Sequence, residues 1–118
     1  MQEVTGIGGV FFRARAPKRL IQWYDQYLGI DTSEKACVQD GGLTVFSPFN
    51  AESDYFGRQA QQWMICFRVA DLGSMIAQLN AGGIETLQQA EWNSEVGTFA
   101  RILDPEGNPI ELWQPPDQ

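Results

Sequence analysis

Apolar residues recur at helical spacing in the first third of the chain. Leu20, Tyr24 and Leu28 fall on one face of a helix. Pro17 suits the first helical turn, where an amide hydrogen would have no partner in any case. Gly29 follows the last apolar position and is typical of a helix end. The pattern predicts an amphipathic helix between this proline and this glycine.

A second helical pattern lies further along the chain. Leu72, Met75 and Leu79 form its apolar stripe, and Asp71 just before them is a suitable N-cap. The glycine pair at 82–83 ends the pattern. The sequence therefore predicts a second amphipathic helix with a side-chain cap at its start.

The two helical segments belong to an internal repeat. When the chain is aligned with itself so that Phe12 falls on Phe67, Arg13 also falls on Arg68, at the same distance from each helix. Two unrelated amphipathic units would also resemble one another, but the matched Phe-Arg pair favours duplication. Each copy is expected to run strand, helix, then further strands.

Strand patterns follow each predicted helix. The polar stretch 50–62 indicates a loop or an irregular edge. Before 109–113, Pro105 can preset φ and Gly107 can take positive φ, which predicts a hairpin turn. The expected strands are residues 31–38, 43–48, 85–89, 98–103 and 109–113.

Length and composition narrow the class of protein. The 118 residues fit one domain, with 43% hydrophobic residues and a net charge of −7 that disfavours nucleic acid and anionic membrane as partners. The chain has no histidine, which excludes mechanisms that need an imidazole. Neither cysteine lies in a CxxC motif, and no apolar run is long enough to span a bilayer. With no signal-peptide pattern, we expect a soluble cytoplasmic protein.

Two motifs point to a known family. The segment Phe11-Phe12-Arg13 through Trp23-Tyr24, and the hairpin Asp104-Pro105-Glu106-Gly107-Asn108-Pro109-Ile110-Glu111-Leu112, resemble the vicinal oxygen chelate superfamily of glyoxalases, bleomycin-resistance proteins and dioxygenases. The resemblance implies a single α+β domain, 1–118, of two βαβββ modules at about 5–60 and 61–115. Their curved mixed sheets would surround a concave pocket, with helices on the outer face. It also implies a homodimer.

The resemblance implies a divalent metal in the family's enzymes, but this sequence departs from the ligand pattern. Two ligand positions fall on Gly9, which has no side chain, and on Met64, whose thioether is a soft ligand. Glu111 is the only family ligand that we can place here. A catalytic metal site typically uses three protein ligands. We therefore expect neither a metal nor another cofactor.

Strand alternation predicts which side chains face the pocket. Phe12, Phe67 and Val69 should face the helices. Each pocket candidate has an ordinary alternative, such as a dimer contact, a solvent-exposed strand end or, for the cysteine, a small buried apolar residue. The candidates for ligand binding are Phe11, Arg13, Cys66, Arg68, Arg101, Glu111 and Trp113 on strands, with Tyr55, Trp63 and Trp92 near the pocket mouth.

One pair of pocket candidates is predicted in more detail. If the hairpin turn contains a glycine bulge, Arg101 lies directly opposite Glu111. Its planar guanidinium group can meet a carboxylate through two hydrogen bonds and supply the positive charge of an absent metal. We therefore expect this pair to form the polar floor of the site.

The expected function is metal-independent binding of a small aromatic or amphipathic molecule, as in drug sequestration. The acidic chain favours planar cationic ligands, whereas an arginine-lined pocket favours carboxylates, and both stay open. No catalytic residue can be assigned. The alternatives are a metal-dependent lyase or dioxygenase of the glyoxalase kind, and a regulatory or structural interaction protein.

Overall fold

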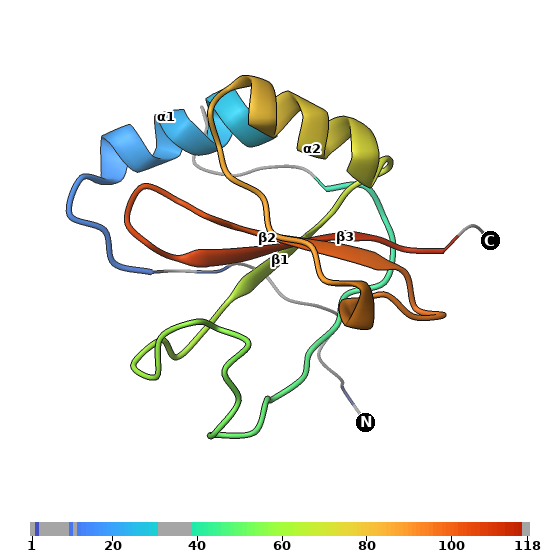
Figure 1. Cartoon of the computed structure of the whole chain (residues 1–118). Coiled ribbons are helices and arrows are strands. Elements are labelled where there is room, and N and C mark those ends of the chain that lie inside the picture. The colour runs from blue at the N-terminus through green and yellow to red at the C-terminus, as the bar shows by residue number, and fades with distance from the viewer. Residues whose placement is uncertain (1, 3–9, 11, 31–38, 117–118) are drawn as a thin grey trace.

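The computed structural model describes residues 2, 10, 12–30 and 39–116. Figure 1 shows two helices on one side of a small sheet. The elements are α1 (Pro17–Leu28), β1 (Ile65–Arg68), α2 (Leu72–Ala81), the short 3₁₀ helix η1 (Ala90–Trp92), β2 (Thr98–Leu103) and β3 (Pro109–Gln114).

Both helices begin and end where the sequence predicts. Pro17 opens α1, and Gly29 closes it in the left-handed conformation at a φ of 68°. Asp71 caps α2, because its carboxylate accepts a hydrogen bond from the Ser74 amide at 3.0 Å. Gly82 ends that helix.

The hairpin of β2 and β3 is confirmed in position and register. The antiparallel pairing places Arg101 opposite Glu111. The Asp104 carboxylate accepts hydrogen bonds from the amides of Glu106 at 2.8 Å and Asn108 at 2.9 Å, which closes the turn. Gly107 takes a φ of 82°, as the turn requires.

The sheet is mixed, with the strand order β1-β3-β2. β1 runs parallel to β3, and this register sets Cys66 beside Glu111. β3 is therefore the central strand and brings residues of both neighbours next to its own carboxylate.

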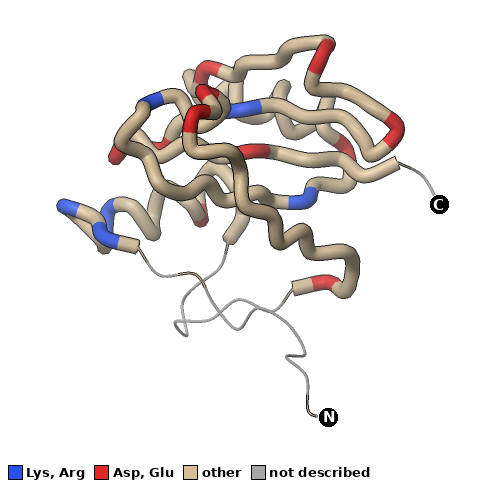
Figure 2. The backbone as a smooth tube through the Cα atoms, turned by 90° about the horizontal axis from the view of Figure 1, so that it is seen from below, with Lys and Arg blue, Asp and Glu red and all other residues tan. Residues whose placement is uncertain are grey.

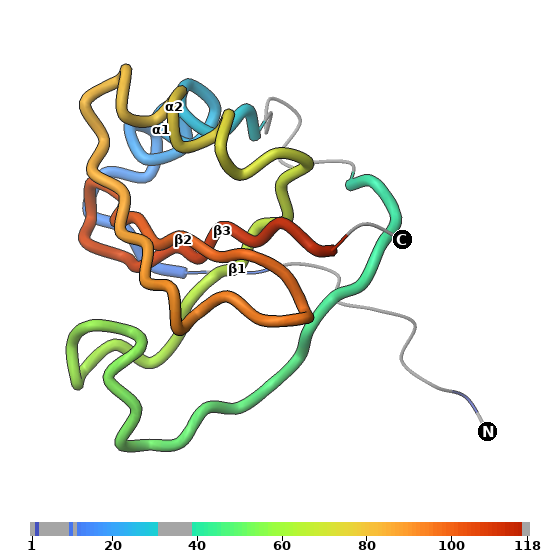
Figure 3. The backbone as a smooth tube through the Cα atoms, turned by 45° about the vertical axis from the view of Figure 1, so that its right-hand side comes forward, coloured from blue at the N-terminus to red at the C-terminus, as the bar shows by residue number. Residues whose placement is uncertain are grey.

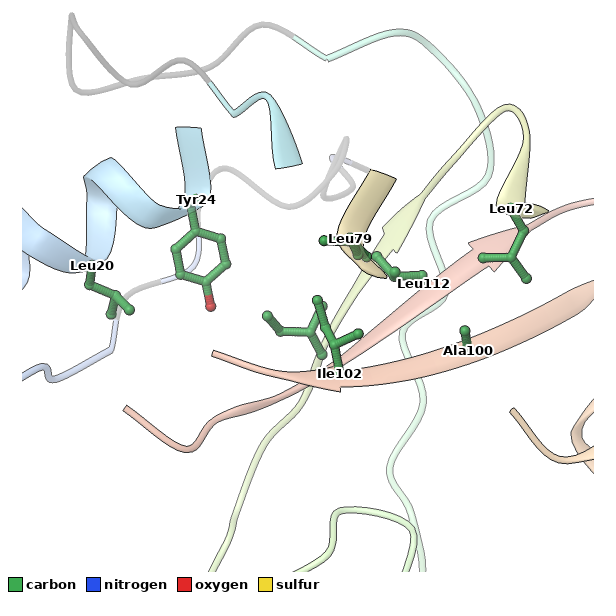
Figure 4. Close-up of a cluster of buried hydrophobic side chains, with 8 residues drawn as sticks. Leu20, Tyr24, Leu72, Leu79, Ala100, Ile102 and Leu112 are labelled. Atoms are coloured by element: carbon green, nitrogen blue, oxygen red, sulfur yellow. The ribbon is translucent and has the colours of Figure 1, made fainter. Parts of the chain in front are cut away.

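The hydrophobic core lies between the sheet and the helices. Figure 4 shows Leu20 and Tyr24 of α1 and Leu72 and Leu79 of α2 above the sheet residues. Phe12, Phe67 and Val69 pack against this core, which confirms that they face the helices. The buried sheet residues beneath the helices are Ala100, Ile102, Ile110 and Leu112.

Two predicted strands are wrong. Residues 43–48 are exposed and form no ladder, and in 85–89 only Leu87 makes an isolated bridge, to Arg101. Strand preference depends on a neighbouring strand and a surface to cover, which the described residues do not provide for 43–48. The predicted strand 31–38 lies outside the described residues. The α+β class is confirmed, and the two-module arrangement stays a prediction.

The segment of residues 39–62 leads from the end of the helices to the opposite side of the sheet (Figures 1 and 3). Turns within it are closed by local hydrogen bonds such as Gly57 N to Asp54 O at 2.9 Å. None of the helices in the described part of the chain is long and apolar enough to cross a membrane.

Candidate functional site

The sheet has a second face that carries no helix. Because side chains alternate along a strand, the partners of the core residues point to this side. We call this surface the helix-free face and define it by Cys66 of β1, Phe99 and Arg101 of β2, and Glu111 and Trp113 of β3.

Tyr55 links the two charged residues of the helix-free face. Its hydroxyl group donates to Oε2 of Glu111 at 2.5 Å, and its carbonyl oxygen accepts a hydrogen bond from Nη1 of Arg101. The predicted opposition of Arg101 and Glu111 is confirmed by the register. The hydrogen bonds recorded for their side chains, however, go through Tyr55 instead of directly between the two charges.

Arg101 also lies against two aromatic rings. Its guanidinium carbon is 5.5 Å from the centroid of the Trp92 ring and 5.9 Å from that of Tyr55. The two rings meet edge to face, with centroids 5.2 Å apart. Helix η1 holds Trp92 at this position. The cation is therefore retained by cation–π attraction as well as by hydrogen bonding.

Two neighbours of Glu111, Tyr55 and Cys66, stay neutral near pH 7. Partial burial, followed by the hydrogen bond to Glu111, raises the pKa of Tyr55 far above its usual range. The same two causes raise the pKa of the Cys66 thiol. Tyr55 is thus a stable hydroxyl donor, and the Cys66 thiol is a poor nucleophile.

Cys66 is exposed as a residue although its thiol is partly desolvated, so its interpretation as a buried apolar residue is wrong. The residue lies on the helix-free face, where the structure places no helix over it. Its exposure follows from strand alternation, since its neighbour Phe67 takes the core side.

Trp113 is more enclosed than a residue at an open pocket would be. Its side chain is only 6% exposed, and its ring is parallel to that of Phe99 within 3°, with centroids 6.3 Å apart. Its indole nitrogen donates to the carbonyl oxygen of Val96 at 2.9 Å. Trp113 therefore forms a fixed aromatic wall of the helix-free face.

Three predicted residues make their side-chain contacts elsewhere, although Arg68 pairs with Trp113 and so borders the helix-free face. Arg68 donates to the carbonyl oxygens of Asp40 and Gly41, at 3.0 and 3.2 Å, and ties the incoming segment to β1. Arg13 and Trp63 line a separate open groove of about 390 Å³. Phe11, like the metal-ligand position Gly9, lies outside the described residues.

Two aromatic residues near the site are not among the sequence predictions. Phe49 stacks on Tyr55 with ring centroids 5.8 Å apart, and no local signal marks it because it lies in an irregular segment. Strand alternation does predict that Phe99 faces the same side as Arg101, because it lies two positions before Arg101 on β2.

Charge around the site is mixed and local. Figure 2 shows acidic and basic residues spread over separate segments of the chain. At the helix-free face, one guanidinium group and one carboxylate oppose each other across neighbouring strands. The site is thus chemically two-sided, with a cation among aromatic rings and an acceptor beside it.

Comparisons with known proteins agree with this fold. TnmS3, an antibiotic-binding protein from Streptomyces sp. CB03234, superposes with a TM-score of 0.64 at 17% identity, covering 98% of this chain and 100% of that one. A glyoxalase family protein from Bacillus anthracis gives a TM-score of 0.57 at 16% identity, covering 97% and 100%. No curated protein sequence matches. Residues 9–113 match the family profile of the Glyoxalase-like domain, and the chain therefore belongs to that family.

Proposed function

We propose that this protein binds a small aromatic or amphipathic molecule, without a metal ion, at the helix-free face. The supporting observation is that four separate segments converge there. Tyr55 comes from the segment after residue 50, Trp92 from η1, Arg101 from β2 and Glu111 from β3. Aromatic walls with a few placed polar groups are the usual composition of a small-molecule site.

The residues around Glu111 do not fit a divalent metal ion. The Arg101 guanidinium group already supplies positive charge on the neighbouring strand, and a metal ion placed there would be repelled. Glu111 also accepts a hydrogen bond from the Tyr55 hydroxyl group. In the described part of the chain, no three His, Cys, Asp or Glu side chains are grouped so as to hold a metal. We therefore assign the carboxylate to ligand binding.

The fold neighbour TnmS3 supports a binding role of this kind, since it is described as an antibiotic-binding protein. We propose the same broad role, drug sequestration without reaction, for this chain. The ligand would contact the cluster of Tyr55, Trp92, Arg101 and Glu111, with Cys66 and Trp113 at its borders.

Tryptophan fluorescence tests the proposal directly. Titration with the amphipathic dye 8-anilinonaphthalene-1-sulfonate and with the planar cation proflavine should give saturable binding of at least one. The variant Trp92→Phe should lose most of the quenching, because its ring belongs to the site. The matched variant Trp23→Phe, on α1, should keep it. Absence of saturable binding by both dyes and by the neutral naphthalenes described below would contradict the proposal.

Elemental analysis separates this function from the alternative of a metal-dependent lyase or dioxygenase. Protein purified without chelator should contain only traces of nickel, zinc, iron and manganese. A near-stoichiometric amount of any of them, lost together with ligand binding in Glu111→Gln, would favour the enzyme instead.

We further propose that the chain acts as a homodimer of two-module subunits. Three apolar side chains in the segment that follows Asp40 and Gly41 are strongly exposed: Phe46 at 89%, Leu43 at 66% and Val45 at 65%. A second copy would cover them. Gel filtration with light scattering should give about twice the chain mass, and a mass near 13.2 kDa would mean a monomer.

A further inference from the structure

Tyr55 fills the site in the way that a ligand would. Its hydroxyl group donates to Glu111 at 2.5 Å and its ring meets Trp92 at 5.2 Å. Its other neighbour, Phe49, is stacked at 5.8 Å. A single side chain thus supplies a flat ring, a hydrogen-bond donor and a partner for the arginine cation.

The structure assigns a ligand class to this site: a neutral planar aromatic molecule with a hydroxyl group, which displaces the phenol of Tyr55. This inference rests on the proposed binding function and goes beyond it by naming the chemistry of the ligand. The ligand hydroxyl would donate to Glu111, and its ring would take the position against Trp92 and Arg101.

The two charges explain why a neutral hydroxyl is preferred to a charged group. An ionised carboxylate such as Glu111 only accepts hydrogen bonds, so it needs a donor. A carboxylate-bearing ligand would approach Glu111 with like charge, and a cationic ligand would approach Arg101 with like charge. A phenol satisfies the carboxylate and offers its ring to the guanidinium group.

Tyr55 can leave without loss of the fold. It lies outside the helices and strands, among turns closed by hydrogen bonds within the segment, such as Ser53 N to Asn50 O at 3.0 Å. Figure 1 shows this segment on the far side of the sheet from the helices that form the core. Rotation of the side chain therefore breaks the contacts of the site but none of the sheet pairs.

The test compares 2-naphthol with 2-methoxynaphthalene, which has the same ring system but no hydroxyl donor. Isothermal titration calorimetry measures both affinities in the unchanged protein, in Tyr55→Phe and in the control Tyr27→Phe on α1. Tyr55→Phe keeps the ring but removes the competing donor, so the fold should be preserved. Circular dichroism verifies this for each variant.

We expect 2-naphthol to bind the unchanged protein about tenfold more tightly than its methyl ether, because a hydrogen bond to a charged acceptor is strong. In Tyr55→Phe, its affinity should rise by about tenfold, since the competing intramolecular hydroxyl is gone. The affinity of the ether should change little, and Tyr27→Phe should match the unchanged protein. The affinity of 2-naphthol should fall as pH rises through the phenol pKa of about 10.

The possible failures are distinguishable. If neither naphthalene nor the two fluorescent dyes bind any variant, the proposed function itself is wrong. If both naphthalenes bind equally, or Tyr55→Phe leaves the affinity of 2-naphthol unchanged, the binding function stands and the inference about the hydroxyl is overturned. An affinity for 2-naphthol that increases on ionisation would overturn it as well, because Arg101 would then be the recognising group.

Discussion

Replacement of Asp104 by alanine should be among the most damaging single changes in the described part of the chain. Asp104 is 4% exposed and lies in the turn between β2 and β3. Its carboxylate accepts hydrogen bonds from the Tyr24 hydroxyl at 2.7 Å, the Glu106 amide at 2.8 Å, and the amide and side chain of Asn108 at 2.9 and 2.7 Å. The turn and helix α1 thus share one buried acceptor.

The expected loss follows from these contacts. At about 1 kcal/mol net for each hydrogen bond, Asp104→Ala should lower the free energy of unfolding by about 4 kcal/mol. The Tyr24 hydroxyl and the Asn108 side chain would also lose a buried partner, which adds to the cost. Asp104→Asn should lose less, because one oxygen acceptor remains. Removal of Tyr24 alone, as Tyr24→Phe, should cost about 1.5 kcal/mol.

Urea unfolding followed by tryptophan fluorescence measures these changes. Asp25→Asn, an exposed position on α1, is the matched control and should stay within about 0.5 kcal/mol of the unchanged protein. Because Asp104 and Tyr24 touch, the double variant should lose less than the sum of the single losses. A loss below about 1 kcal/mol for Asp104→Ala, or strictly additive losses, would refute the reasoning.

Three further predictions concern other contacts. Burial, followed by the hydrogen bond to Asp104, raises the pKa of Tyr24, so its contribution to stability is present below the unfolded phenol pKa of about 10 and is lost as pH rises further. Tyr24→Phe should therefore flatten the fall in the free energy of unfolding at alkaline pH. An unchanged pH profile in this variant would contradict the prediction. Arg101→Met should lower the free energy of unfolding by about 1–2 kcal/mol because the site is half-buried, and adding Glu111→Leu should restore part of this loss. If the losses of the two single variants simply add in urea unfolding, the two residues are not coupled. Gly97→Ala, at a φ of 135° and where an added Cβ would collide with the Gln114 carbonyl oxygen of β3, should lower the free energy of unfolding by about 2 kcal/mol or more, unlike Gly41→Ala, where an added Cβ meets open space. Equal thermal shifts for the two variants would argue against the clash.

The parts of the fold that the sequence predicts are those whose cause is local. Pro17, Gly29 and Asp71 act on the backbone within a few residues, so the helix ends follow from them. The turn around Asp104 fixes the hairpin register, and alternation then puts Arg101 and Glu111 on one face. These steps need no knowledge of distant segments.

The parts that the sequence does not predict depend on distant contacts. Residues 43–48 have a strand-like composition, but they have no ladder partner among the described residues. The position of Tyr55 is set by hydrogen bonds to two strands about fifty residues further along the chain, which no local pattern encodes. The sequence therefore predicts a direct pairing of Arg101 with Glu111 and gives no sign that Tyr55 links them.

The central position of β3 has a consequence for the order of folding. Its pairing with β2 joins residues close in sequence, whereas its pairing with β1 must bring Ile65 to Ile110. Loop closure over the longer separation costs more chain entropy, so we expect the hairpin to form early and β1 to dock late. Substitutions in the hairpin turn should then slow refolding, whereas those at the β1 edge should mainly accelerate unfolding. The proposed ligand-binding cluster, which needs both events, would be assembled only in the last step.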